Sequence, residues 1–254
     1  MLNYKVFGHA SEKPPVLIAH GLFGSLSNWT AIAKKLAVEG HQIFVVDMRN
    51  HGESFWDEEH DYVCMAEDLK TIAESINGRV NIIGHSMGGK AAMVMALEYP
   101  HLISNLIVVD IAPFSYVHNQ SHYLSALEGI DLSSVTKRSE GDKALEEFIA
   151  DKMVRAFLLQ NLVVDKEKKN RWRINIPALK DNMLTLSGFP TKECIFKGRT
   201  LFVKGDRSDY ITHESNVSIQ NLFPNAVFKT IPAAGHWVHA DAPDDFLTVI
   251  MDFI

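Results

Sequence analysis

The sequence predicts an α/β protein with a mostly parallel central sheet, flanked by helices, and an inserted helical cap. Short, continuous apolar runs rich in β-branched residues recur along the chain, and helical patterns separate them. Continuous runs, rather than alternating ones, are typical of strands that helices cover on both faces. One long interval, residues 114–194, lacks a convincing strand and predicts the cap.

Seven apolar runs are expected to form the strands of the sheet. They cover residues 4–7, 16–20, 43–47, 80–84, 106–110, 200–204 and 226–231. Apolar residues repeat at helical spacing after the third and the fourth of these runs, and Pro100 ends the second of these helical patterns. Because strands and helices alternate, we expect most strands to pair in parallel.

The interval 114–194 shows helix-like pieces, such as residues 143–160. A connection of this length without structure of its own is improbable in a compact domain. We therefore expect residues 1–113 and 195–254 to form the core domain. Residues 114–194 are expected to form a helical cap inserted over the sheet.

The composition limits the class of partner. The chain has 254 residues, of which 46% are hydrophobic, and this suffices for one large core. Its 25 basic and 31 acidic residues give a net charge of −6 and are spread without blocks. Nucleic acids and anionic membranes require a concentrated basic patch. We therefore expect a small-molecule substrate, and the sequence carries no signal for an oligomeric state.

The cysteines and the N-terminal residues indicate a compartment. Cys64 and Cys194 lie far apart and are expected to be free thiols, since a small secreted domain would carry several disulfides. The first residues lack a charged segment followed by an apolar run, and no apolar stretch approaches the length of a membrane helix. These features predict a cytoplasmic protein without membrane insertion.

The segment Gly-His-Ser-Met-Gly at residues 84–88 carries the strongest chemical signal. A buried-strand pattern precedes it, and a helical pattern of small residues follows it. A nucleophile elbow requires this context, because its serine sits on a tight strand-to-helix turn and projects above the sheet. The helix that starts after the serine places a positive dipole end beside a developing anion. Ser86 is therefore the predicted nucleophile.

The segment His-Gly-Leu-Phe-Gly-Ser at residues 20–25 ends another buried strand. In hydrolases with a nucleophile elbow, the loop after this strand supplies one N–H group of the oxyanion hole, and the residue after the serine supplies the other. By position, these donors are the backbone N–H groups of Leu22 and Met87. His20 is expected to hold the loop rather than to transfer protons.

Ser86 needs a general base, and the chain order in such hydrolases is serine, acid, histidine. Among the twelve histidines, His236 follows the strand expected at residues 226–231 and precedes a helical pattern at residues 244–253. A loop in this place brings an imidazole to the side of the sheet where the elbow lies. His236 is the predicted base, and His239 is its nearest competitor.

The acid departs from the common pattern, which is Gly-x-x-Asp after the next-to-last strand. Here Ser208 takes the expected position, and Asp206 and Asp209 flank it. Asp110 offers another solution, because it ends the strand after the elbow helix and a buried carboxylate there needs a partner such as imidazolium. We predict Asp110 as the acid, assisted by a hydrogen bond from Ser208, with Asp206 or Asp209 as the alternative.

Residues 47–54 combine an aspartate, an arginine, a histidine and a serine after another strand. We interpret them as a turn that side-chain hydrogen bonds order at the mouth of the site. The cysteines are too scattered for a zinc cluster, and the glycines form no dinucleotide fingerprint. Neither a metal nor a cofactor is therefore expected.

Five segments together resemble α/β-hydrolases, and more narrowly the bacterial YbfF-type esterases. These segments are HGLFGS, DMRNHGES, GHSMGGKA, VVDIAP and AGHWVHA. The resemblance covers most of the chain and weakens over the cap. It implies the α/β-hydrolase fold and a cap-covered carboxylesterase or acyl-thioesterase. It also supports an acid at Asp110 combined with a serine at Ser208.

These residues predict a serine hydrolase that cleaves carboxylic ester or acyl-thioester bonds through an acyl-enzyme, without a cofactor. Alternatives on the same triad are a cofactor-free perhydrolase and a lyase. An alternative from another class is a hydrolase-fold receptor that keeps the triad for ligand binding. Turnover of a generic ester separates a receptor, which would show little, from an esterase, which would show much.

Overall fold

A seven-stranded sheet forms the centre of the protein. The computed structural model describes residues 1–76, 78–117, 120–165, 167, 169–190 and 193–254. The strands are β1 (Tyr4–Phe7), β2 (Val16–Ala19), β3 (Ile43–Val46), β4 (Val80–His85), β5 (Ile103–Val109), β8 (Arg199–Gly205) and β9 (Ala226–Ile231). Their order is β1-β3-β2-β4-β5-β8-β9, and all neighbours pair in parallel except β1 with β3. The predicted, mostly parallel sheet is confirmed.

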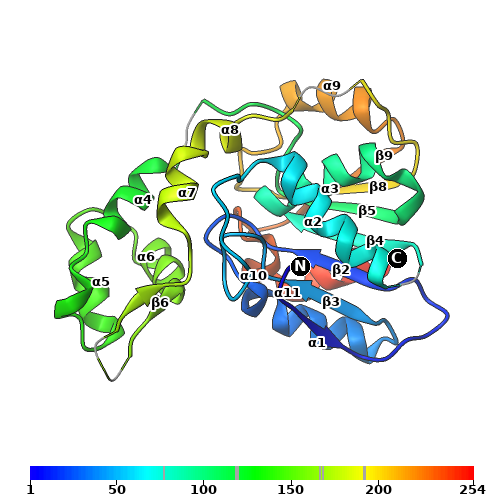
Figure 1. Ribbon diagram of the computed structural model, residues 1–254. Helices are drawn as coiled ribbons and strands as arrows, with labels where there is room; N and C mark the ends of the chain where they lie inside the picture. The colour runs from blue at the N-terminus through cyan, green and yellow to red at the C-terminus, as the bar shows by residue number, and fades with distance from the viewer. Residues whose placement is uncertain (77, 118–119, 166, 168, 191–192) are drawn as a thin grey trace.

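Helices flank this sheet (Figure 1). They are α1 (Thr30–Val38), α2 (Tyr62–Ser75), α3 (Met87–Glu98), α9 (His213–Leu222), α10 (Val238–Asp241) and α11 (Pro243–Met251), with the 3₁₀ turns η1 (Leu26–Trp29) and η2 (Pro100–Leu102). The helix expected at residues 244–253 is α11.

Strand β2 shows why its sequence is a continuous apolar run. Leu17 and Ala19 belong to the buried cluster that includes side chains of α2 and α3. Val16 and Ile18 belong to a second buried cluster, which includes side chains of α1 and α11. Because alternate side chains of a strand point to opposite faces of the sheet, every position of β2 is buried in one of two cores.

The chain between β5 and β8 folds mainly into short helices that extend beside the sheet (Figure 1). They are α4 (Ser121–Glu128), η3 (Leu132–Ser134), α5 (Arg138–Glu146), α6 (Lys152–Leu158), η4 (Leu159–Asn161), α7 (Ile176–Asp181) and α8 (Met183–Ser187). The expectation that this interval lacks strands is wrong, because β6 (Leu162–Val163) pairs antiparallel with β7 (Arg171–Trp172). Strands of two residues are too short to leave a periodic pattern in a sequence.

The helix-like piece expected at residues 143–160 is divided in the structure. Helix α5 ends at Glu146, and α6 begins only at Lys152. The Asp151 side chain accepts hydrogen bonds from the backbone N–H groups of Met153 and Val154, which makes it the N-cap of α6. A capping residue inside an apolar pattern therefore starts a new helix.

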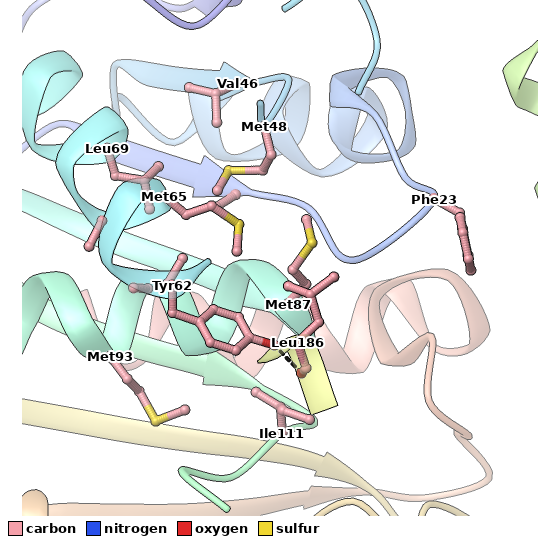
Figure 2. Close-up of a cluster of buried hydrophobic side chains, with 14 of the residues drawn as sticks. Phe23, Val46, Met48, Tyr62, Met65, Leu69, Met87, Met93, Ile111 and Leu186 are labelled. Atoms are coloured by element: carbon pink, nitrogen blue, oxygen red, sulfur yellow. Dashed lines mark hydrogen bonds between the residues drawn. The ribbon is translucent and has the colours of Figure 1, made fainter. Parts of the chain in front are cut away.

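Hydrogen bonds join these short helices to the core. The Tyr62 hydroxyl in α2 donates to the carbonyl oxygen of Leu186 in α8 at 2.6 Å, and Figure 2 shows this bond beside the buried side chains of Met87 and Met93. The Asn161 side chain donates to the carbonyl oxygen of Phe23 at 2.8 Å. Within the described ranges, no helix is both long and apolar enough to span a bilayer.

The parallel strands bring the predicted site residues to one edge of the sheet. Ser86 follows β4 directly, Asp110 follows β5 directly, and His236 lies in the loop after β9. In open α/β sheets, ligands bind outside the carboxyl ends of the strands. The strand connections therefore explain how residues far apart in the sequence meet there.

Candidate active site

Ser86 lies on a strained turn between β4 and α3. Its backbone has φ 52° and ψ −118°, a conformation that L-residues rarely adopt. The turn is tight: a Cβ atom at Gly84 would lie 2.3 Å from the carbonyl oxygen of Gly88. Both glycines of the Gly-x-Ser-x-Gly pattern therefore allow a close backbone approach, and the observed geometry is that of a nucleophile elbow.

The imidazole of His236 lies between a hydroxyl and a carboxylate. Its Nε2 atom is 3.1 Å from the Ser86 Oγ atom, and its Nδ1 atom is 2.7 Å from Oδ2 of Asp110. Since a carboxylate only accepts, Nδ1 carries a proton and Nε2 is free to accept one. The Tyr210 ring stacks on this imidazole at 4.2 Å between centroids, and the backbone oxygen of His236 contacts Nε2 of His85 at 2.9 Å.

Asp110 is completely buried, and three groups surround its carboxylate. Its Oδ1 atom accepts from the backbone N–H of Gly205 at 3.2 Å. Its Oδ2 atom accepts from the Ser208 hydroxyl as well as from His236. These partners offset the cost of burying a charge, which would be several kcal/mol for an unpaired carboxylate.

The structure thus brings together Ser86, His236, Asp110 and Ser208. Asp206 and Asp209, the alternative acids, are exposed. Ser208 is buried, and its backbone N–H donates to the carbonyl oxygen of Gly205 at 3.2 Å, which closes the turn after β8. Ser208 therefore reaches the Asp110 carboxylate from the turn after β8, and its hydroxyl binds the same Oδ2 atom as Nδ1 of His236.

Leu22 and Met87, the predicted oxyanion-hole residues, line the same small cavity as Ser86. Met87 is the first residue of α3, where backbone N–H groups have no acceptor inside the helix. The backbone N–H of Phe23, next to Leu22, donates to Nε2 of His51 at 3.1 Å. Phe23 has a φ of 63°, so a hydrogen bond holds this loop in a costly conformation beside the serine.

His20 and the segment 47–54 stabilise the same loop. The backbone N–H of Met48 donates to Nε2 of His20 at 3.0 Å, and Nδ1 of His20 contacts the carbonyl oxygen of Gly21 at 2.8 Å. Burial lowers the pKa of His20, so its imidazole is kept neutral. The Asp47 carboxylate accepts from the backbone N–H of Leu26 at 2.8 Å. These contacts agree with the interpretation that His20 and the segment 47–54 hold the loop in place.

The serine hydroxyl is contacted by His236 and not by His239, the competing base. Its ring is buried and stacks on Trp29 with centroids 4.1 Å apart and an interplanar angle of 10°. Burial, together with the nearby His236, lowers the pKa of His239 to about 3. A histidine in this environment stays neutral at ordinary pH, and it packs α10 against η1.

One cavity is lined by the serine, and a second lies near it. The smaller one, about 60 Å³, is lined by Ser86, Lys90, Tyr116 and Tyr210, among others. The larger one, about 300 Å³, lies between the core and α6, where Phe157 lines it. Gly21 lines this larger cavity, and a Cβ atom on it would stand 3.1 Å from Cβ of Ser86. The absence of a side chain at Gly21 keeps this cavity close to the serine.

Two residues of the site were not predicted from the sequence. Tyr210 stacks on His236, and Lys90, one helical turn after Ser86, is buried and lines the smaller cavity. A signal for Lys90 existed, since its spacing from Ser86 places it on the neighbouring turn of the same helix. Tyr210 has no such signal, because its place depends on how the turn after β8 packs. Across the described residues, no group of His, Cys, Asp and Glu is arranged to hold a metal ion.

The fold and this geometry define a class of protein, and comparison with known proteins agrees. A family model described as alpha/beta hydrolase fold matches residues 14–243, so the chain belongs to this family. The sn-1-specific diacylglycerol lipase ABHD11 of Danio rerio is 38% identical over 261 residues, which cover 100% of this chain and 82% of that protein.

Esterase YbfF of Escherichia coli K12 is 34% identical over 242 residues, which cover 94% of this chain and 92% of that protein. The solved structure of a marine microorganism esterase matches with a TM-score of 0.94 at 37% identity, covering 100% of this chain and 99% of the other. The resemblance to YbfF-type esterases is confirmed. These esterase and lipase relatives support a hydrolase that acts on ester bonds.

Proposed function

We propose that this chain hydrolyses carboxylic esters or acyl thioesters through a covalent acyl-enzyme on Ser86. The observation that carries the proposal is the continuous hydrogen-bonded series from Asp110 to His236 to Ser86, with distances of 2.7 and 3.1 Å. A nucleophile next to a base that a third group orients is the arrangement that activates a serine hydroxyl.

In the first step, Nε2 of His236 accepts the Ser86 proton while Oγ attacks the acyl carbonyl carbon. The carbonyl oxygen becomes an oxyanion, which accepts hydrogen bonds from the backbone N–H groups of Leu22 and Met87. The imidazolium then donates its proton to the departing alcohol or thiol, and the acyl group stays bound to Oγ.

In the second step, His236 accepts a proton from water, and the hydroxide attacks the acyl carbon. The oxyanion forms again in the same place, Oγ leaves with the proton from the imidazolium, and the acid is released. Asp110 keeps Nδ1 protonated and stabilises the imidazolium. Ser208 donates to the same carboxylate and orients it toward Nδ1.

The division of labour within the chain belongs to this proposal. Residues 1–113 and 195–254 form the core that carries the reacting groups, and residues 114–194 form a cap that shapes the binding site. Phe157 in α6 lines the larger cavity, and its ring lies 5.1 Å from that of Trp237, the residue after His236. A side chain of the cap thus reaches the loop of the proposed base.

The proposal is tested by steady-state hydrolysis of matched acyl esters and acyl thioesters, with release of the free acid as the readout. We expect many turnovers for the wild type on at least one of the two series, and loss of turnover in Ser86→Ala. Binding without turnover on both series would instead indicate a receptor. Products other than the free acid would indicate lyase or perhydrolase chemistry.

A further inference from the structure

Lys90 is a lysine buried within the site. It lies in α3 one turn after Ser86, its exposed fraction is 1%, and it lines the same small cavity as Ser86. Its Nζ atom donates to the carbonyl oxygens of Ser187, at 3.3 Å, and of Gly188. The ammonium group also lies over the Tyr116 ring at 4.8 Å.

The surroundings of the Lys90 ammonium group are carbonyl oxygens and aromatic rings. Of the acidic residues that the structure describes, none forms an ion pair with it, and burial is the cause that lowers its pKa, to about 7. Carbonyl dipoles and aromatic faces stabilise a cation only partly. A positive charge that is removed from water without an anion beside it costs free energy, and an anionic ligand would recover this cost.

We propose that Lys90 binds a carboxylate at the far end of a short acyl group, so that the preferred substrates are monoesters or monothioesters of dicarboxylic acids. This inference rests on the proposed function, because it concerns the acyl group that Ser86 would carry. The carboxylate would accept a hydrogen bond from Nζ while the acyl carbonyl lies at the Ser86 hydroxyl.

The shape of the site favours the acyl side over the leaving group. The cavity that holds Lys90 also contains Ser86 and both proposed oxyanion-hole residues, Leu22 and Met87. The acyl group must stay beside Ser86 through both steps, whereas the alcohol or thiol must leave. With about 60 Å³, this cavity fits only a short group, and the cavity of about 300 Å³ is left for the leaving group.

The length of the acyl group follows from helix geometry. Residues four apart in a helix are separated by about 6 Å along its axis. Because Ser86 and Lys90 line one cavity from neighbouring turns, a chain of a few carbon atoms is what the interval between them requires. A chain such as glutaryl spans this interval, whereas a long dicarboxylic acyl group would exceed the cavity.

A purely structural role for Lys90 makes a different prediction. Its Nζ atom and the Tyr62 hydroxyl together bind the carbonyl oxygens of Leu186, Ser187 and Gly188 at the end of α8. If Lys90 only fastened α8 to α3, its replacement would weaken the hydrolysis of charged and neutral esters alike. The two roles are therefore distinguished by whether replacement of Lys90 changes the preference between charged and neutral esters, not by the loss of total activity.

The test compares two aryl esters of equal size, the aryl hydrogen glutarate and the aryl 5-methylhexanoate, which replaces the carboxylate by an isopropyl group. The measured quantity is the ratio of their kcat/KM values. We expect Lys90→Met to lower this ratio by about ten- to a hundredfold, since a charge-assisted hydrogen bond is lost. Lys34→Met removes an exposed lysine on α1 and is the matched control, for which the ratio should not change. An equal loss on both esters in Lys90→Met would overturn the inference.

A second measurement uses the wild type alone and covers the case in which Lys90→Met does not fold. Glutarate should inhibit the hydrolysis of a neutral ester competitively, at a concentration at least tenfold lower than hexanoate requires. Equal inhibition by the two acids contradicts a carboxylate subsite. An acetate ester that carries a carboxylate on its alcohol should not be preferred over a neutral acetate ester. A preference for it would mean that Lys90 binds a carboxylate of the leaving group instead.

Failure of this inference differs from failure of the proposed function. If the wild type turns over neither ester, and Ser86→Ala behaves like the wild type, the proposed hydrolysis itself is wrong. If both esters are turned over in a Ser86-dependent reaction but the Lys90→Met ratio is unchanged, only the subsite is wrong.

Discussion

The Oδ2 atom of Asp110 lies 2.7 Å from Nδ1 of His236, although 126 residues separate them in the sequence. Asp110 comes from the end of β5, whereas the usual place of the acid is the turn after the next-to-last strand, which here holds Ser208. The Ser208 hydroxyl donates to the same Oδ2 atom. The acid therefore follows β5 instead of β8. The serine at the usual place of the acid, after β8, donates a hydrogen bond to it.

This relationship predicts a graded loss of activity. Asp110→Asn should lower kcat by about three to four orders of magnitude, because an amide no longer holds Nδ1 in the protonated tautomer. Ser208→Ala should lower kcat about tenfold, because it removes one hydrogen bond to a carboxylate that keeps its other partners. Asp206→Asn, at an exposed position of the same turn, is the control. The measurement is kcat on a generic ester for all three variants, and a severe loss in Asp206→Asn with an active Asp110→Asn would reject this assignment.

Ser86→Ala should abolish turnover and covalent labelling by a fluorophosphonate probe. The serine is the first group of the proposed acyl transfer, and triad members act as a unit, so His236→Ala should fall within about tenfold of Ser86→Ala. Kinetics and labelling of both variants, with circular dichroism to verify folding, make the check. Residual kcat above about a thousandth of the wild type in Ser86→Ala would be too high for a lost nucleophile.

The sheet was predictable because its signal is local. A strand such as β2, with Leu17 and Ala19 in one core and Val16 and Ile18 in the other, must be apolar at every position. The nucleophile elbow was predictable for a similar reason, since its glycines, the preceding strand and the following helix are contiguous in the sequence.

Other features depend on contacts that no local pattern records. Strands β6 and β7 have two residues each and escape any periodicity. The spacing of Lys90 from Ser86 is visible in the sequence, but lysine is usually exposed, so its burial against the carbonyl oxygens of Ser187 and Gly188 appears only in the folded chain. The stacking of Tyr210 on His236 likewise requires the turn after β8 and the loop after β9 to meet.

Two neighbouring residues of α6 should respond differently to truncation. Phe157 lines the larger cavity, whereas Leu158 is fully buried. Phe157→Ala should therefore change selectivity, with a shift of about fivefold or more in the kcat/KM ratio between esters with bulky and with small alcohols. Leu158→Ala should instead destabilise the fold by about 2–5 kcal/mol, the range for a buried leucine.

A panel of esters with graded alcohols and a thermal unfolding curve for each variant separate these effects. If Phe157→Ala leaves the selectivity profile unchanged, the cavity next to α6 is not the leaving-group site.

The last prediction concerns the neutral histidine beside the proposed base. Burial lowers the pKa of His239 to about 3 in the folded protein, whereas an unfolded histidine titrates near its ordinary value of about 6.5. Between these two pKa values, the unfolded chain binds a proton that the folded protein excludes. The stability that depends on neutral His239 is therefore complete above pH 6.5 and is lost progressively as the pH falls toward 3.

His239→Phe should reduce this loss. Phenylalanine keeps the stacking on Trp29 and removes the buried Nδ1 atom, for which the described part of the chain provides no hydrogen-bond partner. Each pH unit below 6.5 lowers the free energy of unfolding by about 1.4 kcal/mol through His239. Between pH 8 and pH 5, the wild type should therefore lose about 2 kcal/mol more than His239→Phe does. His9→Gln, at an exposed histidine, should follow the wild-type curve.

Urea unfolding at both pH values measures the difference. At pH 8, kcat of His239→Phe should lie within about tenfold of the wild type, because His236, not His239, contacts the serine. Identical pH dependences for His239→Phe and the wild type would mean that His239 is protonated in the folded protein, and a collapse of kcat would make it the base.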